Sequence, residues 1–129
     1  MRPNAVSYRV IGAAMKVHTA LGAGILESAY DACLCYEFTR WGLHFQHQVR
    51  LPITYEGNKL SPAYVIDFIV EKCLVVEIKC VEIVLPVHRA QLLSYLRLTG
   101  HKLGLLINFN VPHLKQGIHR VINGPEDEL

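Results

Sequence analysis

The stretch from residue 64 to residue 80 reads YVIDFIVEKCLVVEIKC, and this stretch decides the fold. Two runs of branched and aromatic residues, 64–70 and 74–80, are typical of buried β-strands. Only three residues separate the runs, and a connection this short joins antiparallel strands. The sequence therefore predicts a β-hairpin at the centre of the domain.

Three charged residues interrupt these apolar runs. Asp67 lies in the first strand, and Glu77 and Lys79 share one face of the second because strand residues alternate between faces. A buried charge needs a partner or a metal ion, and the hairpin brings Asp67 close to Glu77 or Lys79. Two neighbouring carboxylates both remain ionised when a divalent cation holds them, and oxygen ligands suit Mg²⁺ or Mn²⁺. On these residues alone, a salt bridge or a solvated face remains the alternative.

The elements on either side of the hairpin complete one domain. The pattern predicts that Ser7 caps a first helix and that Gly42 and Gly100 end the second and third, with Pro52 at a strand edge or bulge. The expected helices are 8–21, 25–41 and 87–98, and the further strands are Phe45–Tyr55, 103–109 and 118–122. The fold class is therefore α/β (α+β), a mixed sheet flanked by helices. We expect residues 1–129 to form a single domain, with a flexible acidic tail at 124–129.

Composition narrows the class of protein further. Of the 129 residues, 51% are hydrophobic and 19% are charged, which favours a folded core over disorder. The net charge of +2 is only a weak indication of a nucleic-acid partner. No apolar run is long enough to cross a membrane, so we expect a soluble cytoplasmic protein with no membrane partner. The four cysteines contain no CxxC pair, which favours reduced thiols over a metal site or a disulfide.

These features together resemble a known family. Asp67, followed by Glu77-Ile78-Lys79 within an αβββαβ core, resembles the PD-(D/E)XK nuclease superfamily and its restriction-endonuclease-like fold. Gln91 and Tyr95 match the QxxxY motif of its RecB-type members, and GILESAY at 24–30 matches the signature of the small GxxExxY proteins. The resemblance extends over residues 10–122.

The resemblance implies roles for the residues of the hairpin. Asp67 and Glu77 would be the metal-binding carboxylates, the backbone carbonyl of Ile78 a further metal ligand, and Lys79 the catalytic lysine. Ile66 departs from the superfamily pattern because it stands where the family's name has proline. This position varies within the superfamily, so the departure leaves the expected metal site unchanged.

The resemblance also assigns residues on the three helices. Glu27 would support the metal shell or orient a water, and Gln91 and Tyr95 would support the site or contact the substrate. His18 is a candidate metal ligand, with a capping or core histidine as the alternative. Tyr30 has a structural alternative too, as a core tyrosine whose hydroxyl bonds to Glu27.

The function that follows is an expectation. It is a nuclease that uses Mg²⁺ (or Mn²⁺) to hydrolyse phosphodiester bonds, with DNA favoured over RNA and a homodimer as a possible assembly. The alternative is a catalytically silent module of the same fold that binds nucleic acid or protein. Hydrolysis of a small phosphorylated molecule is disfavoured, because Gly22 and Gly24 lack the Lys-Ser/Thr of a phosphate-binding loop.

Overall fold

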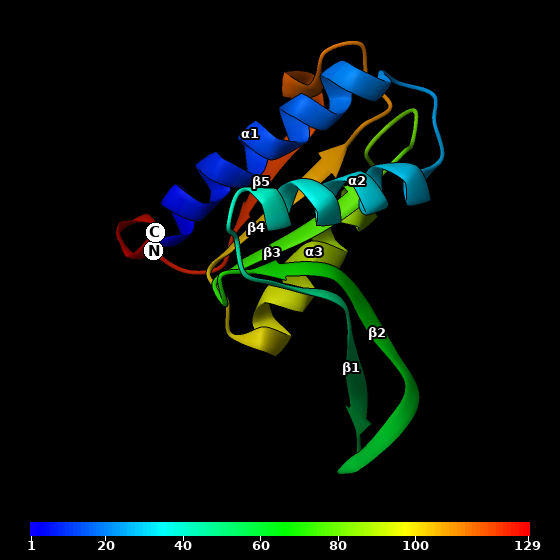
Figure 1. Cartoon of the computed structure of the whole chain (residues 1–129). Coiled ribbons are helices and arrows are strands. Elements are labelled where there is room, and N and C mark those ends of the chain that lie inside the picture. Colours follow the sequence, from blue (N-terminus) through cyan, green and yellow to red (C-terminus); the bar gives the residue numbers. More distant parts are fainter.

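A computed structural model describes residues 1–61 and 64–129. The helices and strands follow one another in the predicted order (Figure 1). The elements are α1 (Pro3–Leu21), α2 (Glu27–Arg40), β1 (Phe45–Tyr55), β2 (Asn58–Val70), β3 (Leu74–Lys79), α3 (Pro86–Thr99), β4 (Leu103–Asn108) and β5 (Ile118–Ile122), with short 3₁₀ turns η1 (Leu114–Gly117) and η2 (Glu126–Glu128).

The five strands form one mixed sheet in the order β1-β2-β3-β4-β5. The pairs β1/β2, β2/β3 and β4/β5 are antiparallel, and β3/β4 is parallel, because α3 crosses over between those two strands. The predicted hairpin of β2 and β3 is confirmed, with Val70 opposite Leu74. The mixed sheet flanked by helices is confirmed as well.

Helices cover both faces of the sheet, as Figure 1 shows. One face packs against α1 and α2, where Phe38 and Phe68 meet edge to face with ring centroids 5.2 Å apart. The other face packs against α3, where Leu92 lies over β4. Gly104 makes this close approach possible, since a Cβ atom there would lie 2.8 Å from the Leu92 side chain. The sheet is therefore buried on both sides, as its apolar strands indicate.

All three helix starts differ from the sequence prediction, and the second helix begins at Glu27 instead of residue 25. The first helix begins at Pro3 instead of residue 8, and Ser7 lies inside it as a buried residue instead of capping it. The third helix begins at Pro86 instead of residue 87. The reason is the same for the first and third helices: proline lacks the N–H that the first helical turn leaves unpaired, so it fits the first position.

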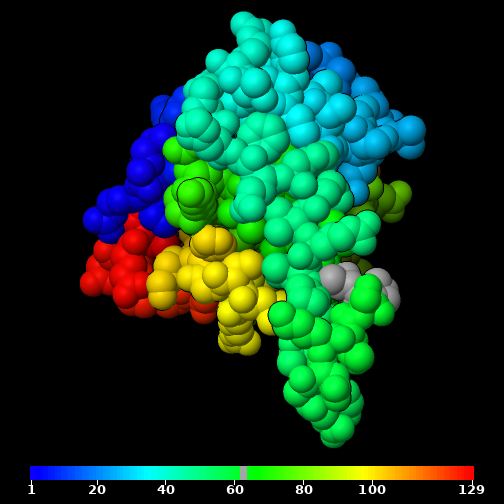
Figure 2. Space-filling model, turned by 60° about the horizontal axis from the view of Figure 1, so that its bottom comes forward, coloured from blue at the N-terminus to red at the C-terminus, as the bar shows by residue number. Residues whose placement is uncertain are grey.

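Strands β1 and β2 continue past the sheet as a two-stranded arm. Their pairing runs from Phe45 opposite Val70 to Tyr55 opposite Asn58, whereas β2 pairs with β3 only from Phe68 onward. Figure 2 shows the tip of this arm projecting beyond the rest of the molecule. Pro52 lies on the edge strand at a shift in register, as predicted.

The acidic tail packs against the start of the chain, which differs from the flexible segment that the sequence suggested. Leu129 is buried, and its carbonyl accepts a hydrogen bond from the backbone N–H of Asn4 at 3.1 Å. Lys102 forms an ion pair with Glu128 at 3.4 Å. The apolar last residue and these polar contacts together hold the tail. Among the described residues, no helix combines the length and the apolar character that a membrane span requires.

Candidate functional site

A pocket of about 290 Å³ lies where the first turn of α2 faces the strands β1, β2 and β3. Six of its seven lining residues carry acidic or polar side chains, in contrast to the apolar core clusters on the two faces of the sheet. The lining residues are Glu27, Ser28, Asp31, His47, Gln48, Asp67 and Ile78. The pocket thus gathers residues that lie up to 51 positions apart in the sequence.

Asp67 takes the place of a missing part of the β2/β3 ladder. The pairing between these strands ends at Phe68 opposite Val76, so the next pair would be Asp67 and Glu77. Instead, the Asp67 Oδ2 atom accepts a hydrogen bond from the backbone N–H of Ile78 at 2.8 Å. This bond takes the place of backbone pairing where the ladder ends, and it fixes the Asp67 carboxylate at the pocket wall, beside Ile78.

Glu77 is a buried carboxyl group with an unsatisfied oxygen. Its exposed fraction is 5%, and its Oε1 atom has no hydrogen-bond partner among the described residues. Burial is the main cause that raises the pKa of Glu77 to about 10; hydrogen bonding to Asp67 and repulsion from it act in the same direction, and Lys79 opposes them. The Glu77 side chain therefore keeps its proton near neutral pH unless a cation binds beside it.

Glu27 and Lys79 belong to the same group of charges. Desolvation raises the pKa of Glu27, Asp67 raises it further, Lys79 lowers it, and Asp31 raises it. Lys79 also lowers the pKa of Glu77, so its ammonium group is close to several carboxylates at once. The structure therefore brings four of the residues implied by the resemblance into one electrostatic cluster.

The two α3 residues of the QxxxY motif lie differently. Tyr95 is buried, and its ring meets that of Tyr64 with centroids 5.8 Å apart. Burial, and then repulsion from Glu77 and Asp67, raises the pKa of Tyr95 to about 12, so its hydroxyl stays protonated beside those carboxylates. Gln91, one helical turn earlier, is exposed to solvent.

His18 lies away from this pocket. Its Nε2 atom is 2.9 Å from the backbone carbonyl of Val111, and its ring lies beside that of Phe109. It lines a separate pocket between the end of α1 and the segment that follows β4. Tyr30 is a buried core residue, but its hydroxyl donates to the carbonyl of Gly22 instead of bonding to Glu27.

Sequence reasoning did not identify Gln48. The register of β1 and β2 passes from His47 opposite Phe68 to Val49 opposite Ile66, which leaves Gln48 out of the pairing. The φ angle of Gln48 is 53°, in the left-handed region. This conformation is energetically unfavourable for residues other than glycine, and it is often found at functional sites. The Nε2 atom of Gln48 donates to Asp67 Oδ1 at 3.4 Å. No residue pattern in a strand predicts this conformation.

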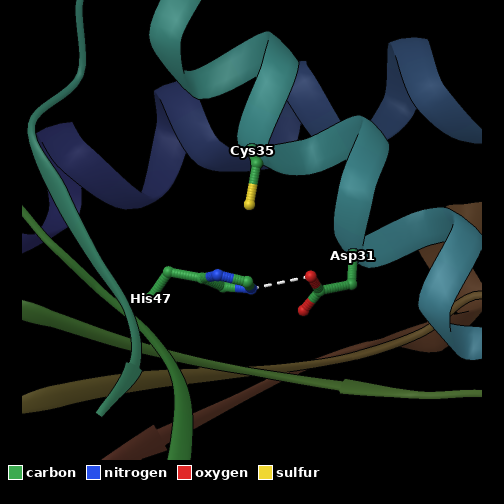
Figure 3. Close-up of side chains that lie close together, drawn as sticks. All are labelled: Asp31, Cys35 and His47. Atoms are coloured by element: carbon green, nitrogen blue, oxygen red, sulfur yellow. Dashed lines mark hydrogen bonds and ion pairs between the residues drawn. The ribbon is translucent and has the colours of Figure 1, made fainter.

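Sequence reasoning also left out Asp31, Cys35 and His47. Asp31 and Cys35 are one turn apart on α2, and His47 faces them from β1 (Figure 3). His47 Nε2 and Asp31 Oδ1 are 2.7 Å apart. The only sequence pattern that points to this group is the four-residue spacing of Asp31 and Cys35, which places both on one helix face.

The donor set beside Glu77 fits a hard divalent ion. Asp67 and Glu77 offer carboxylate oxygens, the Ile78 carbonyl offers a neutral oxygen, and Glu27 lies close enough for its charge to interact with Asp67. The buried, unpartnered Oε1 atom of Glu77 is the observation that carries this fit, because an orphaned buried oxygen requires a compensating partner.

Comparison with known proteins identifies a family. The sequence model of the PD-(D/E)XK nuclease superfamily matches residues 4–121, which include every residue of the pocket. No curated protein and no solved structure gives a significant match to the chain.

Proposed function

Because the chain belongs to the PD-(D/E)XK nuclease superfamily, we propose that it is a metal-dependent nuclease that hydrolyses phosphodiester bonds of DNA with Mg²⁺ or Mn²⁺. One observation carries the proposal: Asp67 lies close to the buried carboxyl group of Glu77, which has an oxygen without a hydrogen-bond partner among the described residues. The charge of Lys79 is near enough to lower the pKa of that group. A salt bridge alone would not leave a buried Glu77 oxygen without a partner.

Asp67, Glu77 and the Ile78 carbonyl are the proposed metal ligands. The Ile78 N–H bond to Asp67 holds that carboxylate in place, and Glu77 lies on the neighbouring strand. A bound divalent ion supplies positive charge for the phosphate and lowers the pKa of a nearby water. Glu27, at the start of α2, is the proposed support of the metal shell. His18 is not included, since its imidazole is hydrogen-bonded in another pocket.

Lys79 and the α3 residues are proposed to act on the substrate side. Three carboxylates alone would repel a phosphodiester, and the ammonium group of Lys79 reduces that repulsion at the point where the strands separate. Tyr95 keeps its proton and can therefore donate a hydrogen bond to the carboxylates. Gln91 is the more exposed of the two and is the proposed substrate contact.

The β1–β2 arm is proposed to guide the nucleic acid to the pocket. The arm begins at His47 and Gln48 in the pocket wall and carries the exposed cations Arg50 and Lys59. Two-stranded ribbons are one of the elements that proteins place against DNA. This arrangement supports a polymeric nucleic acid over a small phosphorylated molecule.

Cleavage assays test the proposal. The parent chain should cleave DNA with Mg²⁺ or Mn²⁺ but not with EDTA, and Asp67→Ala and Lys79→Ala should reduce the rate at least about 100-fold. Lys102→Ala is a matched control, because Lys102 pairs with Glu128 and is not among the pocket residues. Its cleavage rate should equal that of the parent chain.

Two outcomes would contradict the enzymatic proposal. One is a parent chain that cleaves neither DNA nor RNA with either ion, and DNA binding that persists in EDTA would then favour the silent module. The other is equal cleavage by the parent chain and the Asp67 and Lys79 variants. Cleavage of RNA but not of DNA would overturn only the proposal that DNA is the substrate. Dimerisation stays a prediction, which light scattering in solution checks.

A further inference from the structure

Three potential metal ligands of different chemistry meet between α2 and β1. Figure 3 shows the Cys35 thiol and the Asp31 carboxylate pointing from one face of α2 toward the His47 imidazole. One ligand atom from each residue lies within 4.8 Å of the other two. Asp31 and His47 also line the pocket that holds Asp67, whereas Cys35 does not.

The imidazole is held in position before any ion binds. Its ring stacks on that of Phe68, with centroids 4.9 Å apart and an angle of 29° between the planes. Its Nε2 atom contacts Asp31 Oδ1 at 2.7 Å. Cys35 adds a sulfur atom from the next turn of the helix, so only small side-chain movements are needed to surround an ion.

The ligand types select the ion. Thiolate sulfur and imidazole nitrogen favour Zn²⁺ and similar first-row ions, whereas Mg²⁺ favours oxygen ligands alone. Burial, together with Asp31, raises the pKa of the Cys35 thiol, so the thiol holds its proton when no ion is present. An ion that binds there must displace this proton to solvent, and Cys35 then coordinates as a thiolate.

We propose that Asp31, Cys35 and His47 form a binding site for a Zn²⁺-class ion, distinct from the proposed Mg²⁺ ligands Asp67 and Glu77. Three protein ligands leave one position of a tetrahedral ion for water. The ion links α2 to β1 through three coordinate bonds, in addition to the contact between His47 and Asp31 and the edge-to-face packing of Phe38 against Phe45. This site does not depend on the proposed nuclease function.

Cobalt titration of the full-length, reduced chain tests the proposal. Co²⁺ occupies zinc sites and gives an intense thiolate-to-cobalt absorption band only when sulfur is a ligand. We expect one Co²⁺ per chain with this band, and we expect Zn²⁺ to displace it. Cys35→Ser and His47→Ala should lose the band or weaken binding at least about tenfold, because loss of even a hydrogen-bonding partner of a metal ligand costs about 10- to 100-fold in affinity.

Two controls separate this site from its neighbours. Cys33 lies on the same helix as Cys35 but lines a different pocket, between α1 and α2. The Cys33→Ser variant should therefore keep the band. Asp67→Asn weakens the proposed Mg²⁺ site and should also leave the band unchanged. Thermal unfolding gives a second readout: Zn²⁺ should raise the melting temperature of the parent chain and of Cys33→Ser, but not of Cys35→Ser.

Three results would overturn the proposal. The first is a parent chain that binds no Co²⁺ with a sulfur band, which would mean that Asp31 and His47 form only an ion pair. The second is a band that persists in Cys35→Ser. The third is a band lost in Asp67→Asn, which would assign the ion to the neighbouring carboxylates. Circular dichroism of each variant checks that the fold is retained.

Discussion

The two halves of strand β3 follow different rules. Residues 74–76 are apolar and buried, and they are paired on both sides, with β2 and with β4. Residues 77–79 keep the pairing with β4 but lose the pairing with β2, where Asp67 binds the Ile78 N–H instead. One strand thus supplies both a rigid scaffold and an open edge where carboxylates can gather. The comparison predicts that substitutions in the two halves separate stability from activity.

The largest expected effect is on catalysis, in the second half of the strand. Lys79→Met keeps most of the aliphatic side chain but removes the charge beside Glu77 and Glu27. The cleavage rate should fall at least about 100-fold, while the free energy of unfolding changes by less than about 1 kcal/mol, because Lys79 is only half-buried. Single-turnover cleavage and urea unfolding measure the two quantities. Full activity in Lys79→Met would show that Lys79 is not part of the catalytic site.

The first half of the strand should show the reverse pattern. Leu74→Ala empties a fully buried position and should lower the free energy of unfolding by about 2–5 kcal/mol. Cleavage per folded molecule should remain near that of the parent chain when measured well below the melting temperature. A large loss of activity in the folded fraction would show that the two halves are coupled, contrary to the comparison.

Glu77, at the boundary of the two halves, should make stability depend on pH. Between about pH 5 and pH 9, the unfolded chain has lost this proton, since its ordinary pKa is 4.5, whereas the native chain keeps it because the folded pKa is about 10. The native state then binds more protons, so the stability of the metal-free protein should fall as pH rises. Glu77→Gln should remove this part of the slope, as unfolding at several pH values measures.

Magnesium should reverse the effect of Glu77. An ion that holds the Glu77 carboxylate favours its charged form, so Mg²⁺ should raise the melting temperature of the parent chain at pH 8. Glu77→Gln should respond much less, because it offers no negative charge. An equal response to Mg²⁺ in both chains would place the ion elsewhere.

The sequence predicts the scaffold better than the pocket, for a physical reason. The hairpin and the elements around it follow from apolar periodicity and short connections, which are local properties of the chain. The sequence also predicts that Asp67 comes close to Glu77 or Lys79, because a three-residue connection joins their strands, but it leaves the exact register open. The resemblance, not the spacing, implied that Glu27 belongs with them, since no local pattern relates a helix start to a distant strand.

Other features of the pocket are not local. Cys35 and His47 come together only because α2 packs over β1. The sequence spacing relates Cys35 to Asp31 on the same helix, but it does not relate either residue to His47. The sequence makes His18 a candidate metal ligand. Its position is set instead by the packing of α1 against the segment after β4, which directs its imidazole to the carbonyl of Val111. Tertiary packing decides these contacts.

The smallest expected effect concerns Gln48, where one substitution should change stability and activity in opposite directions. Its left-handed φ of 53° is unfavourable for glutamine but ordinary for glycine, so Gln48→Gly should raise the free energy of unfolding by up to about 1 kcal/mol. The same substitution removes the amide that donates to Asp67, so the cleavage rate should fall. Urea unfolding and cleavage assays measure these opposite changes.

Gln46→Gly is the matched control, because Gln46 lies on the same strand, is exposed and pairs regularly with Ile69. Glycine there should lower the free energy of unfolding by about 0.5–1 kcal/mol and leave cleavage unchanged. If the two glycine variants were equally destabilised, Gln48 would carry no backbone strain. If Gln48→Gly were instead more stable and less active, the pocket would retain an unfavourable backbone conformation because Asp67 needs the amide that it presents.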